Sequence, residues 1–426
     1  MNEAVLCCAP NSARRRDAID RQESPTGKYV KQLLYESIGA WCIAAATLSF
    51  AQSKTVPELR QEALALEQQG KNQEAELKWH AIRTAQLRNP EPLAHIGLLE
   101  ARQEHYKEAV PFYRKALALN PNVPGLRLNL ALALFKGGQL KESIPEFVSV
   151  RKSAPANSPD AQRATILIGM AYYGLADYAK AAPNLKEAVE AEPYNLPLLL
   201  ALEHSYLWSN QYKYVLDVYR QILALNPDSA EADMVAGEAL DQMKDNAGAT
   251  DMFRAAVKAD PKQPDAHFGL GYLLWSQKQY PEAVQEFQAE LANDPKHVQS
   301  MLYLADADIQ MDRVSEAAPL LESTVKLDPS LPLAHLDLGI VAAESGHNDD
   351  ALRELTRAER MMPDDVNVHW RLARLYRTMG KKEEAKAEFD KASNLNKQAD
   401  DALYKKIANG SAHPPQGQPP PAPPEK

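Results

Sequence analysis

The side chains best able to bind a metal ion in this 426-residue chain are its ten histidines and three cysteines. His267, His335 and His369 recur at multiples of 34 residues, which would place them at equivalent points of successive structural units. Neighbouring helices pack about 8 to 10 Å apart, whereas zinc ligands lie about 2 Å from the metal, so equivalent residues do not converge on one ion. We therefore predict no metal site and no cofactor.

Motifs of catalysis are also missing from the sequence. It contains no phosphate-binding loop, no His-Glu-x-x-His pair, no Cys-x-x-Cys and no Gly-x-Ser-x-Gly elbow. Carboxylates are abundant, but no acid–base pair stands out among them, and Glu203 beside His204 is the one unusual charged position. We predict no catalytic residues and a protein that is not an enzyme. A polar functional site at Glu203 is the alternative to a locally opened structure there.

The elements that position these side chains are internal repeats. Prolines follow one another every 34 residues from Pro193 to Pro363, and Pro121 and Pro155 form another such pair. Ten units share this register, with four extra residues between the third and the fourth. The units are 56–89, 90–123, 124–157, 162–195, 196–229, 230–263, 264–297, 298–331, 332–365 and 366–399.

Three positions of the unit predict its structure. Positions 8 and 20 are small in nearly every unit, and position 24 is always large and apolar. Small residues let two helices approach closely, the large residue fills the groove beside that contact, and proline at position 32 ends the second helix. Each unit should therefore be two antiparallel helices. A single unit cannot bury its own apolar stripe, so the units must stack.

This spacing and this pattern resemble the tetratricopeptide repeat family, over about 340 residues. The resemblance implies an all-α, right-handed superhelical solenoid of about ten helix-turn-helix repeats. The fifth unit departs from the pattern with Glu203 and Val215 at its small positions, so we expect it to be locally splayed. Lys397 stands where proline is expected in the last unit, and residues 400–408 are predicted to form a capping helix.

In this family the first helix of each unit lines the concave surface, with positions 2, 5, 9, 12 and 13 facing inward. The resemblance thus implies an aromatic-rich groove, and exposed aromatic surface usually marks an interaction site. Its candidate partner-binding residues are Phe135, Tyr173, Leu207, Trp208, Phe268, Tyr272, Trp275, Trp370, Arg374 and Arg377. The alternative is that many of these residues pack on the next unit. Aromatic residues at positions 12 and 13 are the stronger candidates, because polar residues could replace them if nothing were bound.

Residues 30–51 are interpreted as a secretory signal peptide. Lys28 and Lys31 precede an apolar run at 38–50, and Ser49 and Ala51 form a small-residue cleavage site. Two alternatives are an uncleaved anchor, although the run is shorter than the roughly 20 residues that span a bilayer, and the first helix of a cytoplasmic protein. Residues 1–29 are predicted to be an unstructured extension.

Charge narrows the range of partners. The formal net charge is −9, and it is −10 without residues 1–51, which hold 6 of the 48 basic and 5 of the 57 acidic residues. Nucleic acid and anionic lipid both require a basic face, so neither is expected as the main partner. Residues 409–426 are rich in proline and are predicted to be a disordered tail, with a ligand for an aromatic-lined groove as the alternative.

The predicted function is therefore a scaffold that holds a peptide or helix of a partner protein in its concave groove. Resemblance to exported repeat proteins implies a bacterial, periplasmic or exported location and a role in cell-envelope assembly, with membrane contact only through the signal or anchor segment. Two alternatives are a structural subunit that associates with its own copies and an accessory subunit of an envelope enzyme or export complex.

Overall fold

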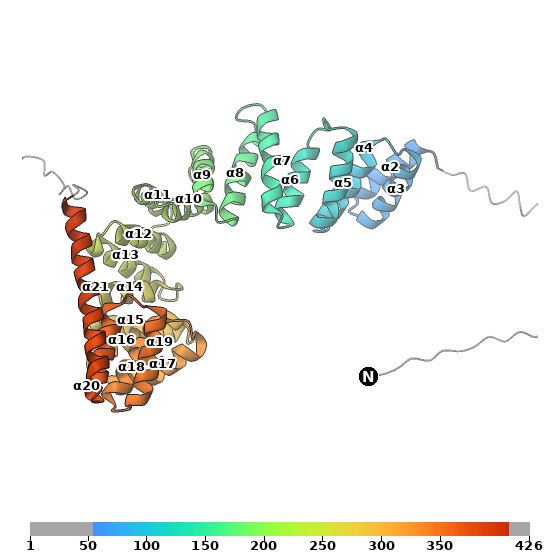
Figure 1. Cartoon of the computed structure of the whole chain (residues 1–426). Helices are drawn as coiled ribbons and strands as arrows, with labels where there is room; N and C mark the ends of the chain where they lie inside the picture. The colour runs from blue at the N-terminus through green and yellow to red at the C-terminus, as the bar shows by residue number, and fades with distance from the viewer. Residues whose placement is uncertain (1–53, 409–426) are drawn as a thin grey trace, which may run out of the picture.

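The computed structural model describes residues 54–408, and every regular element in that range is an α-helix. Its twenty helices form ten antiparallel pairs that stack into an all-α solenoid (Figure 1). The pairs are α2 (Val56–Gln68) and α3 (Asn72–Ala85); α4 (Pro90–Arg102) and α5 (Tyr106–Leu119); α6 (Leu126–Lys136) and α7 (Leu140–Ser153); α8 (Pro159–Gly174) and α9 (Tyr178–Ala191); α10 (Leu196–Trp208) and α11 (Tyr212–Leu225); α12 (Ala230–Gln242) and α13 (Asn246–Ala259); α14 (Ala266–Ser276) and α15 (Tyr280–Asn293); α16 (Val298–Gln310) and α17 (Val314–Leu327); α18 (Pro332–Glu344) and α19 (Asn348–Met361); and α20 (Val366–Thr378) and α21 (Lys382–Ala408).

The turn between the two helices of a pair has the same backbone conformation in all ten units. The residue at position 15 has a positive φ, between 55° and 78°, which reverses the chain after the first helix. Glycine adopts this conformation without steric cost and occupies it at Gly70, Gly138, Gly346 and Gly380. In the other six units residues with side chains, such as Ala176, accept the strained conformation.

Contact between positions 8 and 24 holds the two helices of a pair together. A β-carbon added to Gly97 would lie 2.8 Å from the ring of Tyr113, and one added to Gly339 would lie 2.5 Å from Leu355. The large residue thus lies directly over the small one, as the pattern predicts. This close approach explains why position 8 excludes larger side chains in nine of the ten units.

The four extra residues before the fourth unit lengthen its first helix. Helix α8 has 16 residues and begins at Pro159, with the Ser158 hydroxyl accepting a hydrogen bond from the amide of Ala161. Serine at the N-cap and proline in the first turn are both favourable for a helix start. The insertion is therefore absorbed as an additional turn of helix.

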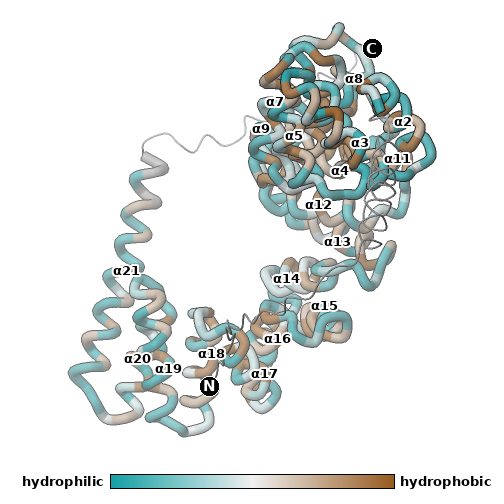
Figure 2. Tube along the Cα trace, turned by 90° about the vertical axis from the view of Figure 1, so that its right-hand side faces the viewer, coloured by the Kyte–Doolittle hydropathy of each residue, from teal (hydrophilic) through white to brown (hydrophobic). Residues whose placement is uncertain are grey.

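The last helix runs on past the final repeat. Helix α21 has 27 residues and continues without a break through residues 400–408, so no separate capping helix is formed there. Lys397 stands where proline follows the second helix in most units, and no proline interrupts α21 up to Ala408. Figure 2 shows the end of α21 projecting beyond α20. Leu403 and Ile407 are apolar residues of the predicted cap at 400–408, and their side chains lie outside the described residues.

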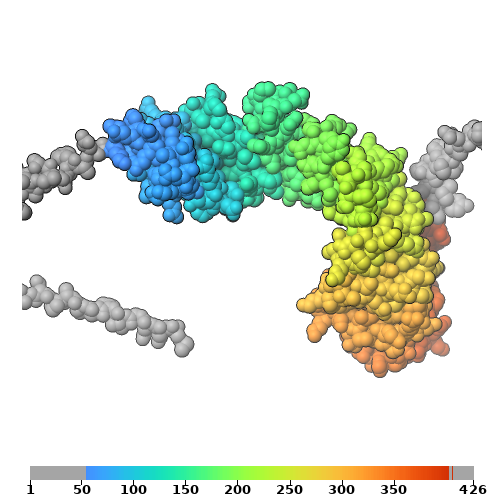
Figure 3. Space-filling view, turned by 180° about the vertical axis from the view of Figure 1, so that it is seen from behind, coloured from blue at the N-terminus to red at the C-terminus, as the bar shows by residue number. Residues whose placement is uncertain are grey.

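The stack of repeats is bent. Helices α2 to α9 form one arm and α14 to α20 the other, with the change of direction at α10 to α13 (Figures 1 and 3). First helices of successive pairs contact one another, as α10 does with α12 and α16 with α18, whereas second helices pack mainly on first helices. First helices therefore line the inner, concave face of the bend.

The fifth unit lies at this bend and is looser than the others. Helices α10 and α11 pack less closely than the two helices of any other unit. Glu203 and Val215, which replace the usual small residues, are both fully buried between them. The pair of helices that packs least closely is therefore the pair with larger side chains at both small positions of the pattern.

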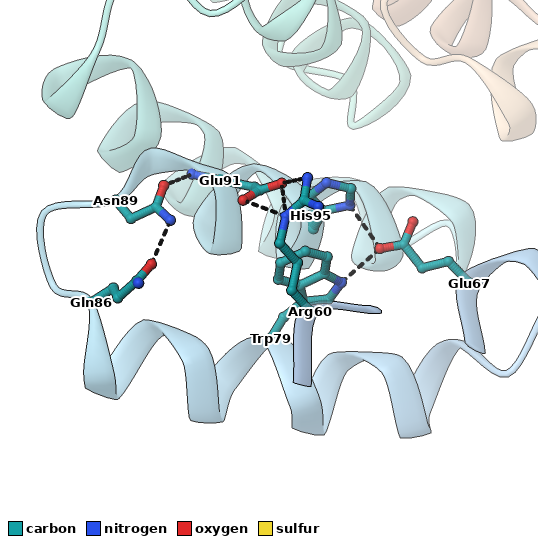
Figure 4. A network of polar contacts seen from close by, with 7 residues as sticks. All are labelled: Arg60, Glu67, Trp79, Gln86, Asn89, Glu91 and His95. Atoms are coloured by element: carbon teal, nitrogen blue, oxygen red, sulfur yellow. Dashed lines mark hydrogen bonds and ion pairs between the residues drawn. The ribbon is translucent and has the colours of Figure 1, made fainter. Parts of the chain in front are cut away.

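Polar contacts join the first two repeats at the other end of the solenoid. The Trp79 ring stacks on His95 with centroids 4.2 Å apart, and both side chains contact Glu67 Oε1 at 2.7 Å (Figure 4). Arg60 donates to both carboxylate oxygens of Glu91 across the same junction. The carboxylate of Glu67, which is partly shielded from water, thus has hydrogen-bond partners from both α3 and α4.

Candidate functional site

A hollow of about 710 Å³ opens on the concave face at the bend. We call it the central hollow. It is formed by the first helices α10, α12, α14 and α16 with their adjoining turns, together with Tyr212 of α11 and Phe253 of α13. Its apolar part is lined by Leu207, Trp208, Tyr212, Met234, Phe253, Phe268, Tyr272 and Leu273. This volume is within the range of sites that accept a small ligand or a few side chains of a peptide.

Trp208 is the most exposed aromatic side chain of the central hollow. It is the last residue of α10, its accessible surface is 61% of the maximum, and the residues described offer it no hydrogen bond. Its ring stacks at 6.3 Å on Tyr178, which in turn contacts Tyr173 edge-on at 5.8 Å. Tyr173 is half-buried, and its hydroxyl lies 2.9 Å from Nδ1 of His204. The aromatic surface therefore extends from the hollow toward α8.

A second aromatic group forms the opposite side of the central hollow. Phe268 and Tyr272 lie on α14 with ring centroids 6.2 Å apart, and Tyr272 stacks on Trp275 at 5.8 Å. Tyr303 from α16 contacts all three rings. Tyr272 is 37% exposed, so this group offers surface to a partner while the rings beneath it are packed.

Trp275 has a structural role that its position in the sequence does not reveal. Its indole N–H donates to Oδ2 of Asp306 at 2.6 Å, and Asp306 is buried. Burial raises the pKa of Asp306, and the hydrogen bonds from Trp275 and Gln310 oppose this effect. Trp275 thus satisfies a buried carboxylate of the next repeat, and its removal would affect folding as well as binding.

Acidic side chains accompany the apolar surface of the central hollow. Glu238 and Asp241 lie on α12, and Asp265 precedes α14. Burial raises the pKa of Glu238, and the charges of Asp265 and Asp241 raise it further. Asp265 forms an ion pair with His297 at 3.0 Å. No lysine or arginine is among the residues that line the hollow in residues 54–408.

The ten predicted groove residues fall into separate groups. Leu207, Trp208, Phe268 and Tyr272 line one hollow, although Leu207 is only 5% exposed and belongs mainly to the core. Trp275 and Tyr173 adjoin it. Phe135 lies apart, half-buried against Phe147 of its own repeat. In the last repeat, Arg374 lies 5.2 Å over the ring of Trp370, and Arg377 lies 6.0 Å from Phe389. Trp370, Arg374 and Arg377 form a separate basic and aromatic surface.

Several residues that line the hollow or contact its aromatic side chains are missing from the sequence-based set. Tyr178 and Tyr212 begin second helices at position 17, so a rule restricted to first helices overlooks them. Glu238 and Asp306 do occupy position 9, which the family pattern directs inward. Reading that position for charged as well as apolar residues would have found both.

One group of side chains in the described residues has the geometry of a metal site. Ligand atoms of Glu359, His369 and Glu388 lie within 4.8 Å of one another. Lys391 donates to both glutamates, at 3.1 and 2.7 Å, and the two ring nitrogens of His369 face Glu388 and the Pro363 carbonyl. The carboxylates are therefore already neutralised by a lysine, and the group acts as an ion-pair network.

The same histidine contact recurs in other repeats. His267 and His335, like His369, occupy position 4 and lie within 2.9 Å of the glutamate at position 23 of their own unit. The three histidines are buried, and each pairs within its unit and not with another histidine. The spacing that suggested metal ligands therefore reflects a repeated link between the two helices of a unit.

Two buried carboxyl groups have unpartnered oxygen atoms. Neither oxygen of Glu203 has a hydrogen-bond partner in the described structure, and burial raises its pKa to about 9, with Glu231 and Asp233 contributing. Burial likewise raises the pKa of Asp337 well above its usual range, with Asp306 adding to the effect. Glu203 is 0% exposed, so it offers no surface to a ligand.

Comparison with known families assigns the chain to a family. Three family profiles, each described as a tetratricopeptide repeat, match it at residues 60–124, 216–264 and 242–298; at 100–165, 274–336 and 342–409; and at 163–195. Together they cover more than half of the sequence. The chain belongs to the tetratricopeptide repeat family. No curated protein sequence matches it.

Solved structures share the fold at low sequence identity. PilF of Pseudomonas aeruginosa is 16% identical, with 51% of this chain and 97% of that chain covered and a TM-score of 0.42. YrrB, a TPR protein with an unusual peptide-binding site, is 20% identical, with 44% and 97% covered and a TM-score of 0.37. A chain of the APC/C hetero-tetramer Cut9–Hcn1 is 13% identical, with 83% of this chain and 89% of that chain covered and a TM-score of 0.39. These likenesses concern the fold alone.

The helices of the described residues were compared with the length and hydropathy that a membrane span requires. No helix within residues 54–408 is both long and apolar enough to span a membrane. The predicted signal peptide and the proline-rich tail lie outside the described residues, so both remain predictions.

Proposed function

We propose that this tetratricopeptide repeat protein is a non-enzymatic scaffold that binds a peptide or helix of a partner protein in the central hollow. The observation that carries the proposal is the exposure of Trp208 on the concave face, across the central hollow from Tyr272. Covering a large aromatic side chain with a partner removes apolar surface from water and lowers the free energy. Tryptophan and tyrosine are also enriched among the residues that dominate binding.

The binding mode follows from the shape of the site. Apolar side chains of a partner segment would pack between Trp208 and the Phe268–Tyr272 pair, and polar groups around the hollow would set its register. The hollow is open at the surface of a pre-formed scaffold, so little ordering of this chain opposes binding. We further propose export to the bacterial periplasm and a role in cell-envelope assembly, which rest on the signal-like residues 30–51.

A crosslinking pull-down from intact cells tests the proposal. The informative variant is Trp208→Ser, because Trp208 has no structural hydrogen bond, whereas replacing Trp275 would also strand Asp306. Tyr194→Ser is a matched control, since Tyr194 is 82% exposed and does not line the hollow. Loss of a partner with Trp208→Ser but not with Tyr194→Ser, and with unchanged circular dichroism, is the expected result. Partners retained by both variants would reject the hollow as the binding site.

The same sample tests the proposed location and the competing assembly. An intact mass that begins at Gln52 would support export, and one that retains residues 1–51 would contradict it. Size-exclusion chromatography at several concentrations distinguishes a partner protein from a second copy of this chain. A mass that rises with concentration and falls with Trp208→Ser would favour self-association.

A further inference from the structure

We infer that the partner segment recognised by the central hollow is cationic, with lysine or arginine side chains beside the apolar side chains that pack on Trp208 and Tyr272. This inference rests on the proposed function and specifies the chemistry of its partner. It follows from the charges that surround the apolar part of the hollow.

Three carboxyl groups from two repeats face the same hollow. Glu238 and Asp241 are one helical turn apart on α12, and Asp265 lies at the start of α14. They border a surface formed by Met234 and Phe268. A segment that places an apolar side chain on this surface must therefore bring its neighbouring side chains next to carboxylates.

Within the described residues, the chain supplies almost no counter-charge to this group. Glu238 and Asp241 form no ion pair and no side-chain hydrogen bond there, and Asp265 has only His297. Some acidic groups elsewhere in the solenoid do have a basic partner, since Arg102 lies near Glu67 and Lys391 contacts Glu388. The acidic side of the hollow differs from these groups in lacking a lysine or arginine.

Electrostatics then discriminates among possible occupants. A neutral apolar segment would displace water from the carboxylates and offer nothing in return, and an acidic segment would add repulsion. A lysine or arginine would restore the lost solvation and relieve the mutual repulsion that Asp265 and Asp241 exert on Glu238. A chain with a formal charge of −9 also attracts cationic segments over a distance, which raises the rate of association.

Short synthetic peptides added to the full chain test the inference. Three probes share their tryptophan and leucine positions and carry lysine, glutamine or glutamate at the remaining positions. Fluorescence anisotropy should show the lysine probe binding about tenfold more tightly than the glutamine probe, and the glutamate probe binding most weakly. Raising the salt concentration should reduce the difference between the lysine and glutamine probes.

Matched variants separate the hollow from general charge attraction. The double variant Glu238→Gln, Asp241→Asn should lower the affinity of the lysine probe to that of the glutamine probe. The control Asp400→Asn, Asp401→Asn removes the same formal charge from exposed residues of α21 that do not line the hollow, and should change the affinity less than twofold. An equal loss in both double variants would overturn the inference.

Other outcomes distinguish this inference from the proposed function. If the lysine and glutamine probes bind equally and both are lost with Trp208→Ser, the cationic partner is rejected and the proposed function stands. If Trp208→Ser alters neither probe binding nor the pull-down, the proposed function fails. Carbodiimide coupling of Glu238 or Asp241 to a lysine of residues 1–53 would make a segment of this chain the occupant and overturn the inference of a separate partner.

Discussion

Replacing Glu203 with glutamine should stabilise the protein at neutral pH. Glu203 is fully buried at a position that is alanine or glycine in the other nine units, and neither of its oxygens has a hydrogen-bond partner in the described structure. Glutamine has nearly the same shape but does not titrate. The substitution therefore removes the ionisation of this side chain and leaves the packing of α10 against its neighbours in place.

The size of the effect follows from the two pKa values. The pKa is about 9 in the folded protein and 4.5 for an ordinary glutamate, so folding at neutral pH requires the carboxylate to take up a proton. Each pH unit between the unfolded pKa and the working pH costs about 1.4 kcal/mol, which gives about 3 kcal/mol at pH 7. Because the folded pKa is raised, the stability of the wild-type protein is greatest below pH 4.5 and decreases as the pH rises toward 9.

Urea unfolding at several pH values measures this difference. Between pH 5 and pH 7, the wild-type free energy of unfolding should fall by about 2.5 kcal/mol relative to Glu203→Gln. Because repeat arrays can unfold in parts, hydrogen exchange of α10 peptides provides a local measurement of the same difference. Glu322→Gln, which alters an exposed glutamate of α17, should leave the pH dependence unchanged. Parallel pH profiles for Glu203→Gln and the wild type would refute the reasoning.

Three further predictions concern the backbone, a histidine and a close contact. Ala176→Gly should stabilise the protein by about 1 kcal/mol, because Ala176 has φ 55°. Gly346→Ala, at the equivalent position, should destabilise it by a similar amount. A melting temperature that shifts in the same direction in both variants would contradict this prediction. The pKa of His369 is raised because hydrogen bonds to the Pro363 carbonyl and Glu388 outweigh the opposing effect of burial. Its contribution to stability is thus present below about pH 6.5 and is lost as the pH rises through the folded pKa. The protection of α20 amides against hydrogen exchange, measured relative to the intrinsic exchange rate at each pH, should therefore fall with pH in the wild type and not in His369→Asn. Gly269→Ala should destabilise the α13–α14 contact by about 1 to 3 kcal/mol, because the new β-carbon would lie 2.1 Å from the Phe253 ring; an unchanged urea midpoint would show that the ring moves at no cost.

Repeat spacing was sufficient to predict the helices of this protein. A side chain at position 8 meets position 24 of its own unit, so the small and large residues of the pattern are a direct record of contacts such as Gly339 against Leu355. The proline at position 32 likewise marks the end of a helix by a local steric effect. Its absence does not by itself predict that a helix continues, because α3 ends at Ala85 although Leu87 occupies position 32. The sequence was interpreted as a separate capping helix at 400–408, whereas α21 continues through these residues.

The composition of the central hollow depended on contacts between units. Trp208 and Trp275 appear equivalent in the sequence, because both lie at inward positions of first helices. Only the structure shows that Trp275 is committed to Asp306 of the following repeat while Trp208 remains in water. Whether such a side chain is exposed depends on what the neighbouring unit places opposite it.

The sequence by itself determined the repeat register and the helical class, because these follow from local periodicity and short-range packing. The aromatic residues of the groove were expected from the family resemblance. The tertiary structure alone decided where the solenoid bends and which charges gather there. Glu238 and Asp241 share a helix, but Asp265 joins them only through the rotation between successive repeats. How successive repeats stack depends on contacts between units, which the pattern within one unit does not specify.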